Sequence, residues 1–247
     1  MIPLKTQEEM EIMAEGGKKL ARVKNSLKDA VKEGVTAPEI EDLAVKLIQK
    51  EGGEPSFKMV PGYSWATCVN VNEGLVHGIP SKSMVFKKGD VVSVDVGMYF
   101  KGFHTDTSFS VGISPEEDTK KFLEVGKKAL TKAISEVKVG RHIYDISKAI
   151  QDTITAAGYS PVKALVGHGV GRELHEEPQI PCFVPGGDSP EVKPGMVLAV
   201  EVMYSQGSPD VVQEADGWTI AMRDGKIAGL FEETVAVSYE GSRVLTS

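Results

Sequence analysis

Cysteine is scarce in this chain of 247 residues, which contains only Cys68 and Cys182. Two cysteines leave room for one isolated disulfide but not for a disulfide framework, and no repeated Cys/His spacing indicates a structural zinc site. Runs of 18 apolar residues are also absent, and the first residues lack a basic segment followed by an apolar one. We therefore expect a soluble, cytoplasmic protein with no membrane partner.

Positive charge is also in short supply. The chain has 28 Lys and Arg residues against 35 Asp and Glu residues, so its net charge is -7. That is the wrong sign for a protein that neutralises nucleic-acid phosphates, so we expect no nucleic-acid partner. Hydrophobic residues make up 41% and charged residues 26% of the chain, which is normal for a globular protein with a sizeable core.

Two amphipathic helices are predicted at the start of the chain. Residues 6–33 carry apolar side chains at helical spacing among many Lys and Glu residues. A second helix should follow, because Thr36 and Glu39 match a T-x-x-E capping box. Gly52 supplies a left-handed end to that helix.

The region after Ser114 repeats this order. Ser114 and Glu117 match an S-x-x-E box, and the two helices predicted after them end at Gly158, which lies 106 positions after Gly52. The same offset relates two further pairs of glycines: Gly34 with Gly140, and Gly89 with Gly195. We infer an internal repeat.

Strands and acidic residues follow the same repeat. Asp95 and Glu201 lie 106 positions apart inside apolar runs, and each run precedes a second strand that begins with an acid, Asp106 or Glu232. The extra residues of the second half, 203–230, read as an extended hairpin. The expected fold class is α+β, with helix, helix, strand and hairpin occurring twice around a mostly antiparallel sheet. Without a linker, we expect one domain, 1–247, with halves of about 1–112 and 113–247.

The four repeat-related acids point to a metal centre. Burying a carboxylate costs several kcal/mol unless a cation or hydrogen bonds compensate. A network of buried acids paired with Arg or backbone amides stays open, but no Arg lies near the four in sequence. Two divalent cations would balance their charge, and carboxylates with an imidazole suit Mn, Fe, Co or Zn.

One histidine is the candidate nitrogen ligand. His168 lies in the glycine-rich segment 167–178, where the backbone can approach a crowded site closely. His77 and His175 lie near turn glycines and prolines, a context that suits neutral imidazoles reaching a substrate from loops. We interpret His104 and His142 as surface histidines.

Six segments together resemble one family, the type I methionine aminopeptidases of the pita-bread fold, over essentially the whole chain. These segments are CVNVNEGLVHGIP (68–80), GDVVSVDVGMYFKGFHTDTSFSVG (89–112), GHGVGRELHEEP (167–178), VKPGMVLAVEVM (192–203), DGWT (216–219) and FEETVAVS (231–238). The resemblance implies a metallo-hydrolase that removes the initiator methionine from nascent proteins and peptides when the second residue is small. A metal-bound hydroxide would attack the first peptide bond.

Carried over by motif position, the resemblance assigns a role to each site residue. Two divalent metal ions (Co, Mn, Fe or Zn) would be held by five ligands: Asp95, Asp106, His168, Glu201 and Glu232, with Asp106 and Glu232 bridging. Glu201 would also transfer a proton, while His77 and His175 would be catalytic groups that hydrogen-bond the substrate. Tyr63, Cys68 and Trp218 would line the methionine pocket.

The chain departs from the family pattern at two positions, because Leu174 stands where some members have an aromatic and Glu233 where a His is frequent. Neither is a predicted ligand. Besides nascent chains that begin with Met, the resemblance leaves a transient ribosome contact open, and monomer is the default state. The rivals are a prolidase or proline aminopeptidase, a non-catalytic pita-bread binding module, and a metal-free scaffold with buried acids.

Overall fold

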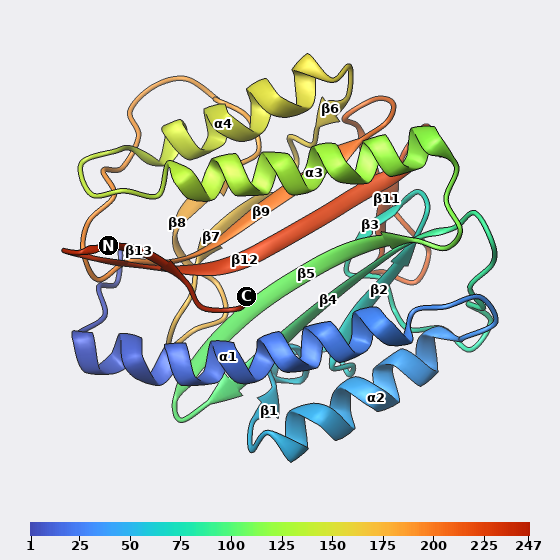
Figure 1. Ribbon diagram of the computed structural model, residues 1–247, viewed down its shortest axis with the longest axis horizontal. Coiled ribbons are helices and arrows are strands. Elements are labelled where there is room, and N and C mark those ends of the chain that lie inside the picture. The colour runs from blue at the N-terminus through green and yellow to red at the C-terminus, as the bar shows by residue number, and fades with distance from the viewer.

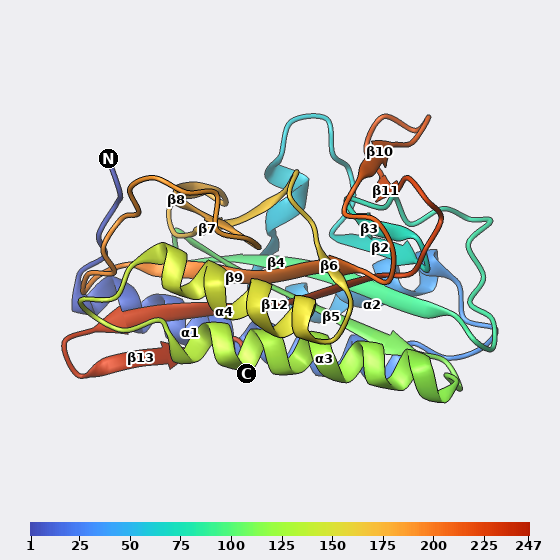
Figure 2. The same cartoon turned by 90° about the horizontal axis from the view of Figure 1, so that it is seen from above.

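The computed structural model of the protein describes residues 1–247 and packs four long helices against one face of a sheet (Figures 1 and 2). None of these helices is long and apolar enough to cross a membrane. The helices are α1 (Gln7–Ala30), α2 (Ala37–Lys50), α3 (Glu117–Ser135) and α4 (Ile143–Ala156), and a short 3-10 helix, η1, spans Ser56–Met59.

The main sheet has ten strands, and all their pairings are antiparallel. Its central order is β1-β4-β5-β12-β9-β7-β8, with β2 beside β4, β13 beside β12 and β6 beside β9. The strands are β1 (Glu54–Pro55), β2 (Thr67–Val71), β4 (Val91–Phe100), β5 (Phe103–Gly112), β6 (Ser160–Pro161), β7 (Val166–Gly169), β8 (Glu176–Pro181), β9 (Val197–Ser205), β12 (Ala228–Ser238) and β13 (Gly241–Val244). The predicted α+β class with a mostly antiparallel sheet is confirmed.

Local sequence signals explain where most helices begin. Thr36 and Glu39 form the predicted capping box at the start of α2, and Thr6 and Glu9 form another at the start of α1. The predicted box at Ser114 was wrong. Helix α3 begins at Glu117 without a side-chain cap, and Ser114 has a φ of 48°, whereas an N-cap residue needs extended backbone.

The predicted repeat is visible in the backbone. Gly52 and Gly158 follow α2 and α4 with φ of 79° and 82°, and Gly89 and Gly195 precede β4 and β9 with φ of 93° and 89°. Because L-residues with a side chain rarely adopt such angles, each pair marks the same turn in both halves. The halves meet where β5 pairs with β12, so the sheet runs through both of them.

The two largest hydrophobic clusters lie between the sheet and the helices, one mainly in each half. The first half contributes 17 buried residues, mainly from α1, α2 and β4, and the second half contributes most of a 29-residue cluster around α3, α4, β9 and β12. At about 1.5–3 kcal/mol for each large buried side chain, these clusters supply the main driving force for folding. They leave the opposite face of the sheet free for polar groups.

The extra segment of the second half forms a hairpin, as predicted, but it leaves the main sheet. Strands β10 (Val211–Gln213) and β11 (Ile220–Met222) pair with each other, and β11 pairs with β3 (Gly74–Val76). Gly217, with a φ of 78°, lies in the connection between β10 and β11. The small sheet projects from the face opposite the helices (Figure 2), so the hairpin overhangs the polar face of the main sheet.

Candidate metal centre

Four of the five predicted ligands come from the central strands, and their register puts three of them in one row. Cys68 of β2 is paired with Asp95 of β4, Asp95 with Ser108 of β5, Ser108 with Glu232 of β12, and Glu232 with Glu201 of β9. Residues directly opposite each other in a sheet project from the same face. Val94 and Val200, the residues just before Asp95 and Glu201, pack in the clusters under the helices, so the row projects from the opposite face.

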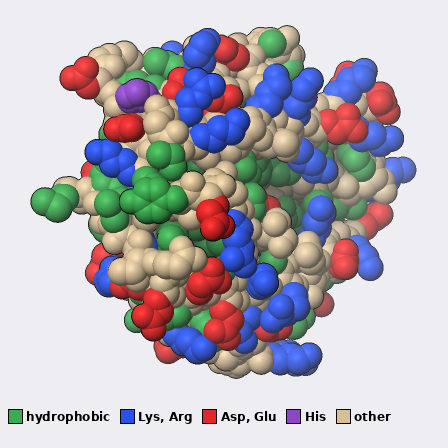
Figure 3. Space-filling view, turned by 60° about the vertical axis from the view of Figure 1, so that its left-hand side comes forward, with side chains coloured by type: hydrophobic (Ala, Val, Ile, Leu, Met, Phe, Trp, Pro, Cys, Tyr) green, Lys and Arg blue, Asp and Glu red, His purple; other side chains and the backbone are tan.

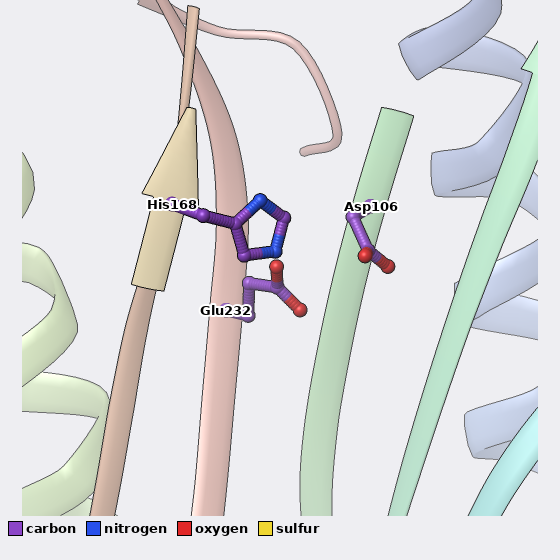
Figure 4. A group of neighbouring side chains, drawn as sticks. All are labelled: Asp106, His168 and Glu232. Carbon is purple, nitrogen blue, oxygen red and sulfur yellow. The ribbon is translucent and has the colours of Figure 1, made fainter. Parts of the chain in front are cut away.

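The remaining two predicted ligands lie one pleat away from this row. Asp106 is two residues before Ser108 on β5, and His168 of β7 pairs with Ala199, two residues before Glu201. Side chains two residues apart on a strand share a face. Ligand atoms of Asp106, His168 and Glu232 accordingly all lie within 4.8 Å of one another, and the three side chains converge from three strands (Figure 4).

The same acids line a cavity of about 340 Å³. Every residue that the sequence singled out for the site borders it: Tyr63, Cys68, His77, Asp95, Asp106, His168, His175, Glu201, Trp218 and Glu232. No Lys or Arg is among the lining residues, so no side-chain cation of the cavity wall balances the four carboxylates. The structure thus brings all the predicted residues together, while their individual roles stay predictions.

Crowding and burial make these carboxylates hard to ionise. Burial raises the pKa of Asp106 to about 7, and burial together with the neighbouring carboxylates raises the pKa of Asp95 and Glu232 well above their ordinary values. The pKa of Glu201 is raised in the same way by burial and by Asp106. A divalent cation would reverse this balance, because it stabilises the ionised form of each ligand.

Two oxygens of the acid cluster are buried without a hydrogen-bond partner, Oδ1 of Asp95 and Oε1 of Glu232. Buried polar atoms are almost always satisfied in native structures, so such atoms need an explanation. An oxygen-rich donor set with one imidazole is the set that Mn, Fe, Co and Zn accept. The orphaned oxygens and the uncompensated charge both fit a metal centre.

His168 has the tautomer that a metal ligand needs. Its Nδ1 lies 2.8 Å from the carbonyl oxygen of Gly169, which can only accept a hydrogen bond, so Nδ1 carries the proton. This leaves the lone pair on Nε2, which lies 3.5 Å from Oε1 of Glu201. Burial lowers the pKa of His168 to about 4, which keeps the ring neutral near pH 7.

The other side of the cavity is apolar. Phe57, Tyr63, Cys68 and Leu174 form a separate buried cluster there, with Trp218 packed against it. The Tyr63 hydroxyl donates to the Thr67 carbonyl at 2.9 Å and lies 3.3 Å from the Cys68 sulfur. The Tyr63 ring meets the Trp218 ring edge-on, with centroids 5.1 Å apart.

Phe57 and Val60 are among the lining residues that the sequence did not indicate. They lie in and just after η1, a single turn of helix that no periodicity or motif marks. The only signal in the sequence is the group of apolar residues shortly before Tyr63, which includes Phe57 and Val60 themselves.

The interpretation of His104 as a surface residue was wrong. Its side chain is buried, its Nδ1 lies 2.9 Å from the Ser56 hydroxyl, and its ring packs on Tyr99. Burial lowers its pKa to about 4. His104 precedes Asp106 by two residues and therefore shares its face of β5. Residues 104–108 are all polar, so no alternation of polar and apolar residues indicated that His104 is buried. His142 is exposed, as expected, and caps α4.

A family model described as metallopeptidase family M24 matches residues 11–239. The chain belongs to metallopeptidase family M24. Methionine aminopeptidase 1 of Bacillus subtilis is 42% identical to this M24 peptidase, over 100% of this chain and 99% of the relative.

Solved structures agree with this membership. The crystal structure of a methionine aminopeptidase from Thermotoga maritima matches the M24 peptidase with a TM-score of 0.97 and 40% identity, over 100% of both chains. The protein therefore has the pita-bread fold predicted from sequence. A prolidase from Pyrococcus furiosus shares the fold, with a TM-score of 0.79 and 24% identity, but this chain covers only 65% of it.

Proposed function

We propose that this M24 metallopeptidase is a methionine aminopeptidase that removes the initiator methionine from peptides and nascent proteins. The observation that carries the proposal is the two-sided cavity. One wall holds the acid cluster with His168, and the other is apolar and holds Tyr63, Cys68 and Trp218. The full-length likeness to methionine aminopeptidases supports the same conclusion.

The acid cluster would hold two divalent metal ions. Asp95, Asp106, His168, Glu201 and Glu232 would be the ligands, and the family resemblance implies that Asp106 and Glu232 are shared by the two ions. Such ions lower the pKa of a bound water and polarise a carbonyl. The site chemistry accepts Mn, Fe, Co or Zn, and the choice among them depends on cellular supply.

Glu201 is the proposed proton carrier. It lies at the cavity wall, where its carboxylate can accept a proton in one step and release it in a later one. In the reaction it would take a proton from the attacking water and pass it to the amine that leaves. Its Oε1 lies 3.5 Å from Nε2 of His168 at the edge of the acid cluster.

His77 and His175 are the proposed groups that hydrogen-bond the substrate. Both side chains line the cavity. The partial burial of each ring lowers its pKa below the ordinary value, so both rings are neutral at pH 7. A neutral imidazole N–H donates a hydrogen bond without adding a permanent charge beside the metals. His77 has a φ of 57°, a strained angle for a residue with a side chain, which suits a functional position.

The apolar wall would bind the methionine side chain. Aromatic and thiol surfaces accept a thioether well, and Phe57, Val60 and Leu174 extend the wall formed by the predicted pocket residues. The family resemblance places an aromatic at this position in some members, whereas this chain has Leu174. We therefore expect a pocket of the same chemistry with a different shape.

We propose that residues 1–247 work as one catalytic unit, because the acids come from both halves of one sheet. The substrates begin with Met, so the reaction would take place in the cytoplasm, where nascent chains emerge. A monomer suffices for this site, since all its lining residues come from one chain.

The test is methionine release from the peptides Met-Ala-Ser and Met-Leu-Ser. Metal-chelated protein should be inactive, and adding Mn²⁺ or Co²⁺ should restore cleavage of Met-Ala-Ser alone. Cleavage of a proline-containing dipeptide in place of both would assign the chain to the prolidases. Two bound metals without any cleavage would identify a non-catalytic binding module.

A further inference from the structure

We propose that Lys5 is a positioning residue for the reaction and acts through a buried ion pair with Glu176 that holds His175 in place. The proposal rests on the function proposed above, in which His175 contacts the substrate. Lys5 pairs with Glu176 inside the protein, where their side chains are 1% and 5% exposed. Glu176 directly follows His175 in the chain, so whatever fixes Glu176 also limits the movement of His175.

The segment that carries His175 is a turn beside the irregular end of the β7–β8 pair, where Gly169 pairs with Glu176. Strands β7 and β8 change register between Gly167 and Gly169, and His175 lies just before the first residue of β8. Within the turn, the Glu173 amide donates to Oε1 of Glu176 at 3.2 Å. Glu176 thus uses one carboxylate oxygen to close the turn and the other to bind Lys5.

Lys5 is fixed at the other end by the main sheet. Its backbone amide donates to the Gly195 carbonyl at 2.7 Å, and the Gly195 amide donates to the Val237 carbonyl of β12 at 2.8 Å. Strand β9, which carries Glu201, begins two residues after Gly195. The Lys5 side chain therefore links the His175 turn to the part of the sheet that bears two of the proposed ligands.

The surroundings of Lys5 are shaped for its side chain. A Cβ on Gly171 would lie 2.2 Å from Cε of Lys5 and 2.9 Å from Oε1 of Glu176, so any other residue here would force the ion pair to shift. The Gly171 carbonyl in turn accepts a hydrogen bond from the His104 amide at 2.7 Å, which fixes the start of the turn on β5. Two strands of the sheet thus hold the turn, one through Lys5 and one through His104.

Burying a lysine at this position costs free energy, because the charged ammonium group loses its hydration. Burial lowers the pKa of Lys5, while its bond with Glu176 raises it, and buried ion pairs often add little net stability over apolar side chains of the same volume. The pair instead fixes orientation, because a charge-assisted hydrogen bond holds both side chains in one geometry. Geometry is what a histidine needs if it is to meet a peptide group beside the metals.

The other ion pair of this turn lies on the surface. Arg172 of the turn pairs with Glu9 of α1, but the arginine side chain is 56% exposed. Figure 3 shows the end of the molecule that carries the N-terminus, where positive and negative side chains are interspersed over the surface. An exposed pair of this type is worth little, so the buried pair is the one expected to matter.

The experiment compares Lys5→Met with the parent on Met-Ala-Ser, with metal content and melting temperature measured in parallel. We expect kcat to fall at least 10-fold, KM to change less than threefold and both metals to stay bound. Lys5→Arg, which restores the charge, should recover part of the kcat. The matched control is Lys101→Met, which breaks an exposed lysine–glutamate pair and should keep the parental kcat.

A double-mutant cycle separates positioning from general stability. In a His175→Ala background, Lys5→Met should cause no further loss of kcat, because the residue through which it acts is gone. The same 10-fold loss in both backgrounds would overturn the proposal. If Lys5→Met fails to fold, Lys5→Met/Glu176→Gln, which leaves no unpaired charge, takes its place.

Amide hydrogen exchange supplies a readout that does not need turnover. Exchange in residues 171–177 should accelerate at least 10-fold in the Lys5→Met protein, while exchange in β4 stays unchanged. An unchanged rate in the turn would refute the positioning role, even if the parent protein were active. An inactive parent with an accelerated turn would instead refute the proposed function and leave the structural link standing.

Discussion

His168 and Glu201 meet across neighbouring strands, with Nε2 of the histidine 3.5 Å from Oε1 of the glutamate. Because Nδ1 of His168 donates to a backbone carbonyl, Nε2 has a lone pair and cannot donate to Glu201. A lone pair and a carboxylate oxygen repel each other unless a proton or a cation lies between them. This geometry supports the proposal that the two side chains are ligands of one ion and that Glu201 moves a proton at its edge.

Glu201→Gln should lower kcat at least 100-fold, because the amide keeps an oxygen for metal binding but cannot carry a proton. Turnover of Met-Ala-Ser at saturating Mn²⁺ checks this, with bound metal measured on the same sample. Glu124→Gln, an exposed change on α3, is the control and should behave like the parent. A Glu201→Gln protein as active as the parent would exclude the proton-transfer role.

Asp106→Ala should abolish both metal binding and turnover, since it removes a proposed bridging ligand at the centre of the cluster. Isothermal titration with Mn²⁺ and the peptide assay measure the two effects. Asp118→Ala removes an acid whose side chain is 95% exposed and should alter neither. Full metal occupancy with normal activity in Asp106→Ala would disprove the ligand assignment.

The sequence predicted the acids of the site because a repeat marked them. Asp95 and Glu201 lie at equivalent points of equivalent strands, and burying two such acids demands compensation whatever the rest of the fold. The repeat could not predict the register. Asp95 pairs with Ser108, whereas Glu201 pairs directly with Glu232. The two registers differ because a tight turn at residues 101–102 connects β4 to β5, while residues 206–227 connect β9 to β12.

The parts of the site that lie outside the repeat were harder to predict. The glycines and prolines around His168, His77 and His175 marked them as candidates, but the roles of His77 and His175 came from the family resemblance. Phe57 lies in a single helical turn that no pattern marks. His104 was misjudged because a polar neighbourhood in sequence became a buried one when the turn at residues 171–176 covered it. Burial of this kind depends on contacts distant in sequence, which local patterns do not encode.

Metal-free protein should lose stability as the pH rises. In the folded state the pKa of Asp106 is raised to about 7, above its ordinary value of about 4, so the folded form binds protons more tightly than the unfolded form. The resulting stabilisation is complete below pH 4 and is lost as the pH rises through about 7. Melting temperatures of chelated protein should therefore fall by several degrees from pH 5 to pH 8.

Added Mn²⁺ should raise the melting temperature more at pH 8 than at pH 5, because protons compete with the metal for the same oxygens. Asp106→Asn, which cannot ionise, should show a smaller fall with pH when metal-free. A metal-free melting temperature that rises steadily between pH 5 and pH 8 would contradict the proposed state of the cluster.

Trp218→Ala should raise KM for Met-Ala-Ser about 10-fold with a smaller effect on kcat. The indole lines the cavity and packs edge-on against Tyr63, and loss of such an aromatic surface costs about 1–2 kcal/mol of binding. Tyr239→Ala removes an aromatic side chain that is 92% exposed and not part of the cavity lining, and it should leave KM unchanged. Equal KM values for Trp218→Ala and the parent would remove Trp218 from the pocket.

Gly126→Ala should destabilise the protein by about 1–3 kcal/mol, although alanine is the better helix former. A Cβ at position 126 of α3 would lie 2.4 Å from the Tyr204 hydroxyl oxygen and 2.6 Å from the Phe231 ring. Tyr204 cannot move away easily, because its hydroxyl donates to the Phe122 carbonyl at 2.6 Å. Lys128→Ala, on the exposed face of the same helix, tests helix propensity alone and should cost little. Urea unfolding of the metal-loaded protein measures the free energy of unfolding of both variants. A Gly126→Ala protein as stable as the parent would mean that α3 can move away from the sheet without a loss of stability.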